Sequence, residues 1–260
     1  MPNPIAHPAA SIPFTKAGMV FSALVIGSIS PDFGYLVPLP TPYFMYNAAG
    51  LFLFDVPVGL VLLFLFHSLV KWPLLSLLPK SLQDRLYKHT QGFSFAPLKH
   101  FGLILLSLLI GSLTHIIWDS FTHEYGWIVE QFAFFSIPIN GTPLYTILQS
   151  LSSIIGFIVL LYWFITWWQT APKSDHTLAR FSNVIRTIFL VLTSVSLAVV
   201  EGSIIYFRIS TGSRYVSGHF FLGSTIYSAV FIFSFFGGIY CLAWMIAFHK
   251  TIRRANQSIE

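Results

Sequence analysis

The sequence predicts an all-α, polytopic membrane protein with about five transmembrane helices and one short re-entrant or interfacial helix near the N-terminus. Of its 260 residues, 55% are hydrophobic and only 9% are charged, against about 25% charged residues in a typical soluble domain. Five apolar runs are long enough to cross a hydrocarbon core of roughly 30 Å. The Lys and Arg residues lie in short tracts between these runs, so the net charge of +5 is expected to orient helices rather than bind nucleic acid.

The predicted spans are the segments in which hydropathy, averaged over a window of about 19 residues, is high. A further apolar run, Ala17–Ser30, has 14 residues, fewer than the roughly 17 that a minimal span requires. We therefore expect this run to enter and leave by the same face or to lie at the interface. The five predicted spans cover approximately residues 48–68, 100–121, 145–168, 184–207 and 222–248.

The chain is expected to form a single integral membrane domain over residues 1–260, because no linker or soluble domain is evident. Within it we distinguish an N-terminal segment, 1–47, which carries candidate ligands. The other two parts are residues 48–168, with the first three spans, and residues 169–260, with the last two spans and a basic tail.

Positive charge predicts the orientation, because cytoplasmic loops retain Lys and Arg. Eleven of these residues fall after the first, third and fifth predicted spans, and two, Arg208 and Arg214, fall on the opposite side. We therefore expect a multi-pass protein of the inner (plasma) membrane with a cytoplasmic C-terminus and with Asp32 on the outer face.

The single cysteine limits the chemistry of any metal site. Cys241 lies inside an apolar run, so disulfides within the chain and Cys-based zinc sites are excluded. Any metal ion must be held by His, Asp or Glu.

The end of the second predicted span carries the strongest polar pattern. His115, Asp119 and His123 are spaced i, i+4, i+8, so they project from one helix face. Neighbours four apart have Cβ atoms about 5–6 Å apart, which lets His115 and Asp119 share one divalent ion. His123 lies about 12 Å from His115 along the axis, so it needs a second metal or a role as acid, base or phosphate donor.

Two further acids lie inside predicted spans, where an ionisable residue costs roughly 2.5–3.5 kcal/mol unless it is paired or solvated. Asp55 and Glu201 are each about 9–10 Å below the outer ends of their helices, at the expected depth of His115. Two structural alternatives stay open: Asp55 could make a packing hydrogen bond beside Pro57, and Glu201 could pair with Arg208.

The N-terminal segment supplies more candidate ligands. His7 precedes the short apolar run, and Asp32 follows it in the sequence Gly27-Ser28-Ile29-Ser30-Pro31-Asp32. Alone, His7 suits a surface position and Asp32 suits a turn or helix cap. If the run is re-entrant, both residues return to the outer end of the second span, near Asp119.

At these residues the sequence resembles domain-of-unknown-function family 4184, a group of uncharacterised bacterial membrane proteins. It is more distantly similar to inner-membrane metal-dependent hydrolases and zinc-dependent phospholipase C proteins, which share an early His, a Gly-x-x-x-Pro-Asp turn and a His-x-x-x-Asp helix. The stretches that match the first family are His7–Ala10, Ser22–Asp32, Gly50–Pro57 and His115–His123.

The resemblance implies a metal-dependent hydrolase that acts on phosphoester substrates. A divalent metal ion, zinc or manganese, would be held by His7, Asp32, His115 and Asp119, because mixed imidazole and carboxylate ligands suit zinc. The expected catalytic residues are Asp55 or Glu201 as the base and His123 as the group that assists departure of the leaving group. The related hydrolases carry a further His where this chain has Tyr46-Asn47, which puts a multinuclear centre in doubt.

The position of the site suggests membrane lipid as partner and substrate, since the acids lie near the boundary of tails and headgroups. Two other functions compete with this interpretation: a transporter or ion path built from intramembrane Asp, Glu and His, and a non-catalytic scaffold whose polar groups join helices. An ion path should cross the bilayer, whereas these acids cluster in one leaflet.

Overall fold

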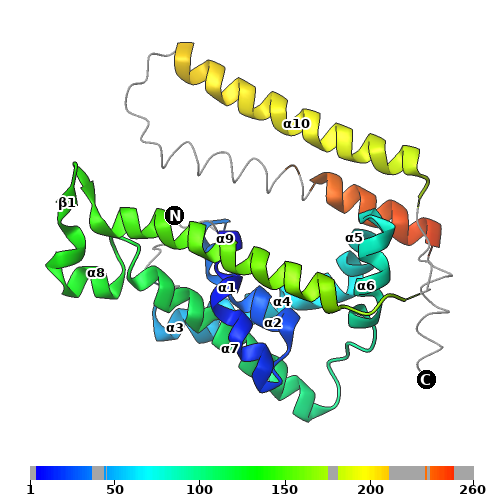
Figure 1. The fold of residues 1–260 in the computed structure, drawn as a ribbon, viewed down its shortest axis with the longest axis horizontal. Helices are drawn as coiled ribbons and strands as arrows, with labels where there is room; N and C mark the ends of the chain where they lie inside the picture. Colours follow the sequence, from blue (N-terminus) through cyan, green and yellow to red (C-terminus); the bar gives the residue numbers. More distant parts are fainter. Residues whose placement is uncertain are drawn as a thin grey trace. The chain divides into compact units, whose positions relative to one another are not determined.

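The computed structural model describes residues 4–36, 44, 46–174, 181–210, 232 and 235–248. The chain divides into two compact units, drawn together in Figure 1. The first comprises Met1–Phe66 and Phe93–Ala171, and the second comprises His67–Gly92 and Pro172–Glu260. This division into units does not test whether residues 1–260 form a single membrane domain, which stays a prediction.

The first unit is built from helices and one small hairpin, and the second from helices. In the first unit, 3-10 turns flank the short helices, and β1 (Pro138–Ile139) pairs antiparallel with β2 (Thr142–Pro143). Its α-helices are α1 (Pro8–Ser11), α2 (Phe21–Gly27), α3 (Ala48–Gly50), α4 (Val56–Leu65), α7 (Leu98–Ser120), α8 (Trp127–Gln131) and α9 (Leu144–Thr170). The second unit contains α5 (Lys71–Leu77), α6 (Lys80–Thr90), α10 (Asn183–Ser210) and an apolar helix over Phe235–Phe248.

The predicted fold class, a mostly helical protein with long apolar helices, is confirmed. Four of the five predicted spans coincide with described helices that are long and apolar enough to cross a membrane. The fifth, 222–248, contains the described apolar helix Phe235–Phe248, and its earlier part falls largely outside the described residues. The four helices are Ala48–Leu77, Leu98–Ser120, Leu144–Thr170 and Asn183–Val200.

The first of these spans is an interrupted α-helix. Leu51–Asp55 forms one π-helical turn, in which the Val56 amide donates to the Leu51 carbonyl. Pro57 comes two residues after the end of this turn, and its ring would clash with the carbonyl of Leu53 in a regular α-helix. A π turn next to this proline relieves the clash, and such turns are frequent at functional sites. Asp55 is the last residue of the turn and is fully buried.

Helix α2 is too short to cross a bilayer. Its seven residues extend about 10 Å, as the length of the run Ala17–Ser30 led us to expect. It crosses α7 at two glycines: a Cβ on Gly27 would collide with the Leu108 carbonyl, and a Cβ on Gly111 would collide with the backbone of Leu24 and Ser28. Small residues at a crossing let helix backbones approach closely.

Serine hydroxyls and apolar packing fix this crossing. The Ser112 hydroxyl donates to the Gly27 carbonyl over 3.1 Å, and the Ser30 and Ser112 hydroxyls lie 3.1 Å apart. The α2–α7 pair thereby holds the turn that follows α2 against the middle of α7. A hydrophobic cluster packs farther along α7, toward its N-terminus; its buried members are Ala23, Leu63, Ile104 and Leu108.

Candidate metal centre

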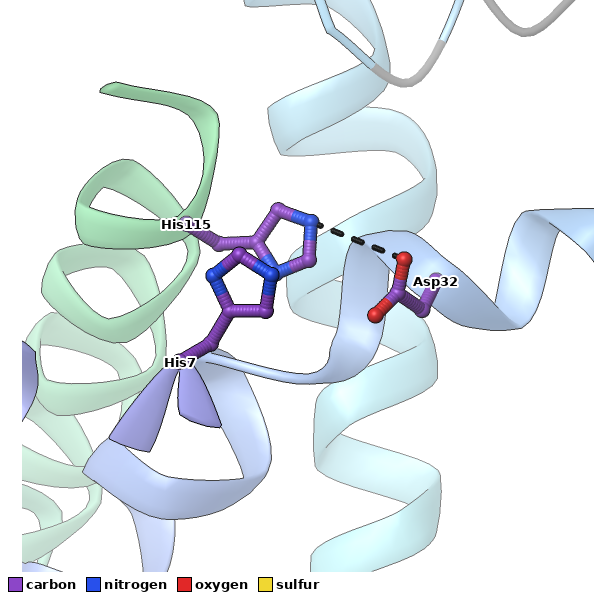
Figure 2. A group of neighbouring side chains, drawn as sticks. All are labelled: His7, Asp32 and His115. Carbon is purple, nitrogen blue, oxygen red and sulfur yellow. Dashed lines mark ion pairs between the residues drawn. The ribbon is translucent and has the colours of Figure 1, made fainter. Parts of the chain in front are cut away.

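Three side chains from different parts of the first unit converge (Figure 2). His7 is the residue before α1, Asp32 lies in the 3-10 helix Ser30–Leu36, and His115 lies in α7. One ligand atom from each lies within 4.8 Å of the other two. The structure therefore brings together three of the four residues predicted as metal ligands in an arrangement that could hold an ion.

His115 is fully buried, and its backbone contact fixes which nitrogen is available. Its Nδ1 lies 2.8 Å from the Ser28 carbonyl oxygen. Since a carbonyl only accepts, Nδ1 carries a proton and donates it. A histidine whose Nδ1–H is held in this way presents Nε2 to a metal ion. That Nε2 lies 3.1 Å from Asp119 Oδ2 and 3.7 Å from Asp32 Oδ1.

His7 stacks on His115. Figure 2 shows the two rings close together. Their centroids are 3.9 Å apart with an angle of 28° between the planes, and Trp118 meets His7 edge-on at 5.3 Å. The Trp118 indole donates to the Ser152 hydroxyl on α9 over 3.0 Å. Burial, reinforced by His115, lowers the pKa of His7 to about 3. His7 is thus neutral at pH 7, which is the form that binds metal ions.

Asp32 contributes a carboxylate that faces His115 Nε2. Burial raises the pKa of its carboxyl to about 6, although the neighbouring His115 opposes this rise. Its Oδ2 is buried and has no hydrogen-bond partner among the described residues. A nearby cation would favour the ionised form of this carboxyl.

Asp119 contacts every histidine of the site without belonging to the group of three. Its Oδ1 lies 3.6 Å from His7 Nε2, and its Oδ2 lies 3.1 Å from His115 Nε2 and 3.5 Å from His123 Nδ1. The fourth predicted ligand is therefore adjacent to the two predicted histidine ligands. A carboxylate in this place can orient imidazole ligands.

Tyr46 contributes to the site although the sequence patterns did not predict it as a functional residue. Its hydroxyl donates to Asp119 Oδ2 over 3.0 Å, and its ring centroid lies 6.2 Å from those of His115 and His123. The one signal for it in the sequence was its place just before the first predicted span, where the expected resemblance to hydrolases would put a histidine. Tyr46 holds one oxygen of Asp119 and leaves the other turned toward His7.

Of the three predicted catalytic residues, His123 and Asp55 are described near the candidate metal centre, and the side chain of Glu201 is not described. His123 follows the end of α7, and its Nε2 lies 3.5 Å from Gln149 Nε2; burial lowers the pKa of its imidazole. Asp55 is buried and interacts electrostatically with His115. Glu201 lies on α10 in the second unit, and its side chain is outside the described residues. The catalytic roles of all three stay predictions.

Buried polar atoms without hydrogen-bond partners gather at this site. Each such atom typically costs about 1–3 kcal/mol, and one common explanation for such a group of atoms is that it binds an ion. The donor set fits a divalent cation, because it consists of imidazole nitrogens and carboxylate oxygens. In the described part of the first unit these atoms are His7 Nδ1 and Nε2, Asp32 Oδ2, both carboxylate oxygens of Asp55, His115 Nε2 and Asp119 Oδ1.

Comparison with known proteins identifies a family. The chain matches a family described as "Domain of unknown function (DUF4184)" over residues 1–236. No curated protein and no solved structure matches significantly. Since the match covers most of the 260 residues and includes the converging site, the chain belongs to the DUF4184 family.

Proposed function

We propose that the chain is a membrane-bound, metal-dependent hydrolase that cleaves a phosphoester. A divalent cation, zinc or manganese, would be held by His7, Asp32 and His115. The observation that carries this proposal is the convergence of one ligand atom from each residue within 4.8 Å. Two of these side chains, His7 and His115, are fully buried and present nitrogens without a hydrogen-bond partner among the described residues. The distant resemblance to metal-dependent hydrolases supports the same chemistry.

The separations between the three ligand atoms are somewhat larger than those between ligands of a bound zinc ion. Ligands at about 2.0–2.1 Å from zinc lie roughly 3.4 Å from one another in a tetrahedron. The His115–Asp32 separation of 3.7 Å is close to that value, while the limit of 4.8 Å means that another pair must close by up to about 1.4 Å. Three protein ligands leave a fourth position open, as in catalytic zinc sites. Asp119, whose Oδ1 lies 3.6 Å from His7 Nε2, would then orient His7, while the Ser28 carbonyl orients His115.

The proposed reaction assigns a proton transfer to each flanking group. When bound, the cation would act as a Lewis acid on the phosphoryl oxygen and make a water molecule more acidic. Asp55 would take a proton from water as the water oxygen bonds to phosphorus. His123, in the protonated form that the neighbouring Asp119 favours against the effect of burial, would give a proton to the ester oxygen as the bond between that oxygen and phosphorus breaks.

An ion path is less well supported by this arrangement. A path would require ionisable or hydrated groups along the helices, whereas a cluster of four apolar side chains packs farther along α7 from the site. Leu108 of that cluster lies about 10 Å from His115 along the helix axis. The polar groups of the described first unit therefore suit a localised site near one membrane face.

Purified protein tests the proposed function. We expect close to one zinc or manganese ion per chain by elemental analysis, and hydrolysis of a synthetic phosphodiester or of phospholipid vesicles that chelation stops and metal addition restores. Hydrolysis of vesicles but not of the soluble ester would assign a lipid substrate. Protein that binds neither ion would refute the proposal.

The long apolar helices are compatible with a multi-pass membrane protein, and we further propose the inner membrane, with the site on the outer face. The charge bias predicts that a reporter fused after Glu260 is cytoplasmic. The same reporter inserted after Asn140, between the second and third spans, should be external. An external reporter after Glu260 would invert the whole topology.

A further inference from the structure

We propose that the segment between α7 and α9 is a membrane-interface anchor that lies in the headgroup layer of the bilayer. The segment runs from residue 121 to residue 143 and contains α8, a 3-10 turn and the β1–β2 hairpin. In Figure 1 it lies beyond one end of α9. Nothing in this proposal depends on the presence of a metal ion or on hydrolysis.

The segment presents large apolar side chains away from the body of the first unit. On its inner side Val129 is buried, and Phe135 packs against Phe121 with a centroid distance of 6.0 Å. Its outer side carries five large apolar side chains that are about half or more exposed. These are Trp127 (66%), Phe132 (55%), Phe134 (64%), Ile137 (50%) and Ile139 (47%). An apolar set of this size marks a contact with a protein partner or a membrane.

The flanking helices decide between those two partners. Both α7 and α9 are long and apolar enough to span a membrane, and the segment joins the last residue of α7, Ser120, to the first residue of α9, Leu144. It must therefore lie where both spans leave the same face of the bilayer.

The backbone fixes the depth. The segment combines a 3-10 turn, a hairpin with strands of two residues each, and irregular connections. Irregular backbone of this kind is not tolerated where it meets lipid in the hydrocarbon core, because its polar groups would lack hydrogen-bond partners there. Exposed Trp and Phe side chains are unfavourable in water, and Trp is enriched at membrane interfaces. The headgroup layer satisfies both conditions, because it is wet enough for polar backbone and apolar enough for aromatic rings.

The binding is driven by apolar burial rather than by charge. Residues 121–143 contain no Lys or Arg, and their acidic residues are Glu124 and Glu130. Attraction to anionic headgroups requires basic residues, so the depth of the segment should not depend on salt or on anionic lipid. Since His123 lies four residues before α8, the anchor would also set the depth of the candidate metal centre.

Spin-label depth measurement tests the proposal. In a Cys241→Ser background, Phe134→Cys would carry a nitroxide in phosphatidylcholine vesicles, and its collision rates with oxygen and with a water-soluble nickel complex would be compared. Ser94→Cys, in an exposed connection, gives the aqueous reference, and Ile158→Cys, near the middle of α9, gives the hydrocarbon reference.

We expect the label at 134 to fall between the two references and to stay there when salt or anionic lipid is added. A label at Ile139→Cys should report the same layer, which guards against a local effect of the Phe134 substitution. Nickel collisions as frequent as at Ser94 would place the segment in water and overturn the proposal. A depth equal to that at Ile158 would also overturn it.

Discussion

Replacing His115 by alanine is expected to abolish stoichiometric metal binding, with at least a 100-fold loss of zinc affinity. The substitution removes the Nε2 that lies between Asp119 and Asp32, and three-ligand sites do not hold an ion tightly with two ligands. Asp32→Asn should have a comparable effect, because an uncharged amide replaces the carboxylate. Elemental analysis and competition with a zinc indicator measure both effects.

The matched control for this experiment is His100→Ala. His100 lies on the same helix as His115, about 22 Å away along its axis, so its loss should leave one ion per chain. Helix content and elution from a sizing column should be unchanged in all three variants. If His115→Ala retained one tightly bound ion, His115 would not be a ligand, and the proposed centre would be wrong.

Sequence patterns predict the parts of this site that depend on local geometry. The i, i+4 spacing places His115 beside Asp119 in any α-helix, and the structure has their closest atoms 3.1 Å apart. The meeting of His7 with this pair is a longer-range expectation. It rested on the shortness of the run Ala17–Ser30, because a run that cannot span returns the chain to the same face.

Other features of the site depend on three-dimensional packing, which cannot be predicted from residue spacing in the sequence. The π turn that ends at Asp55 arises from the position of Pro57, but the sequence does not show which helical hydrogen bonds change. The role of Tyr46 depends on where the chain before the first span folds back. Asp119 shows the same limit: helix spacing made it a candidate ligand, whereas its contacts with Tyr46 and three histidines depend on several elements at once.

The glycine crossing of α2 and α7 should be the position in the fold most sensitive to a single methyl group. We expect Gly111→Ala to destabilise the protein by about 3 kcal/mol, at the upper end for overpacking, because the new Cβ would collide with the backbone of Leu24 and Ser28 rather than with a flexible side chain. Relief requires α2 to move away from α7. That movement would lengthen the contact between the Ser28 carbonyl and His115 Nδ1.

Gly111→Ala should therefore also weaken zinc binding, by about 10–100-fold, the range found when a group that orients a ligand is lost. Gly102→Ala is the matched control, because Gly102 lies on the same helix and a Cβ there meets no atom within 4 Å. Since alanine has a higher helix propensity than glycine, this variant should be as stable as the wild type or up to about 1 kcal/mol more stable. Equilibrium unfolding of detergent-solubilised protein with SDS measures both variants. Equal unfolding midpoints for Gly111→Ala and Gly102→Ala would show that α2 does not press against α7 at this glycine. If that were so, the Ser28 carbonyl could not be held against His115 by this crossing.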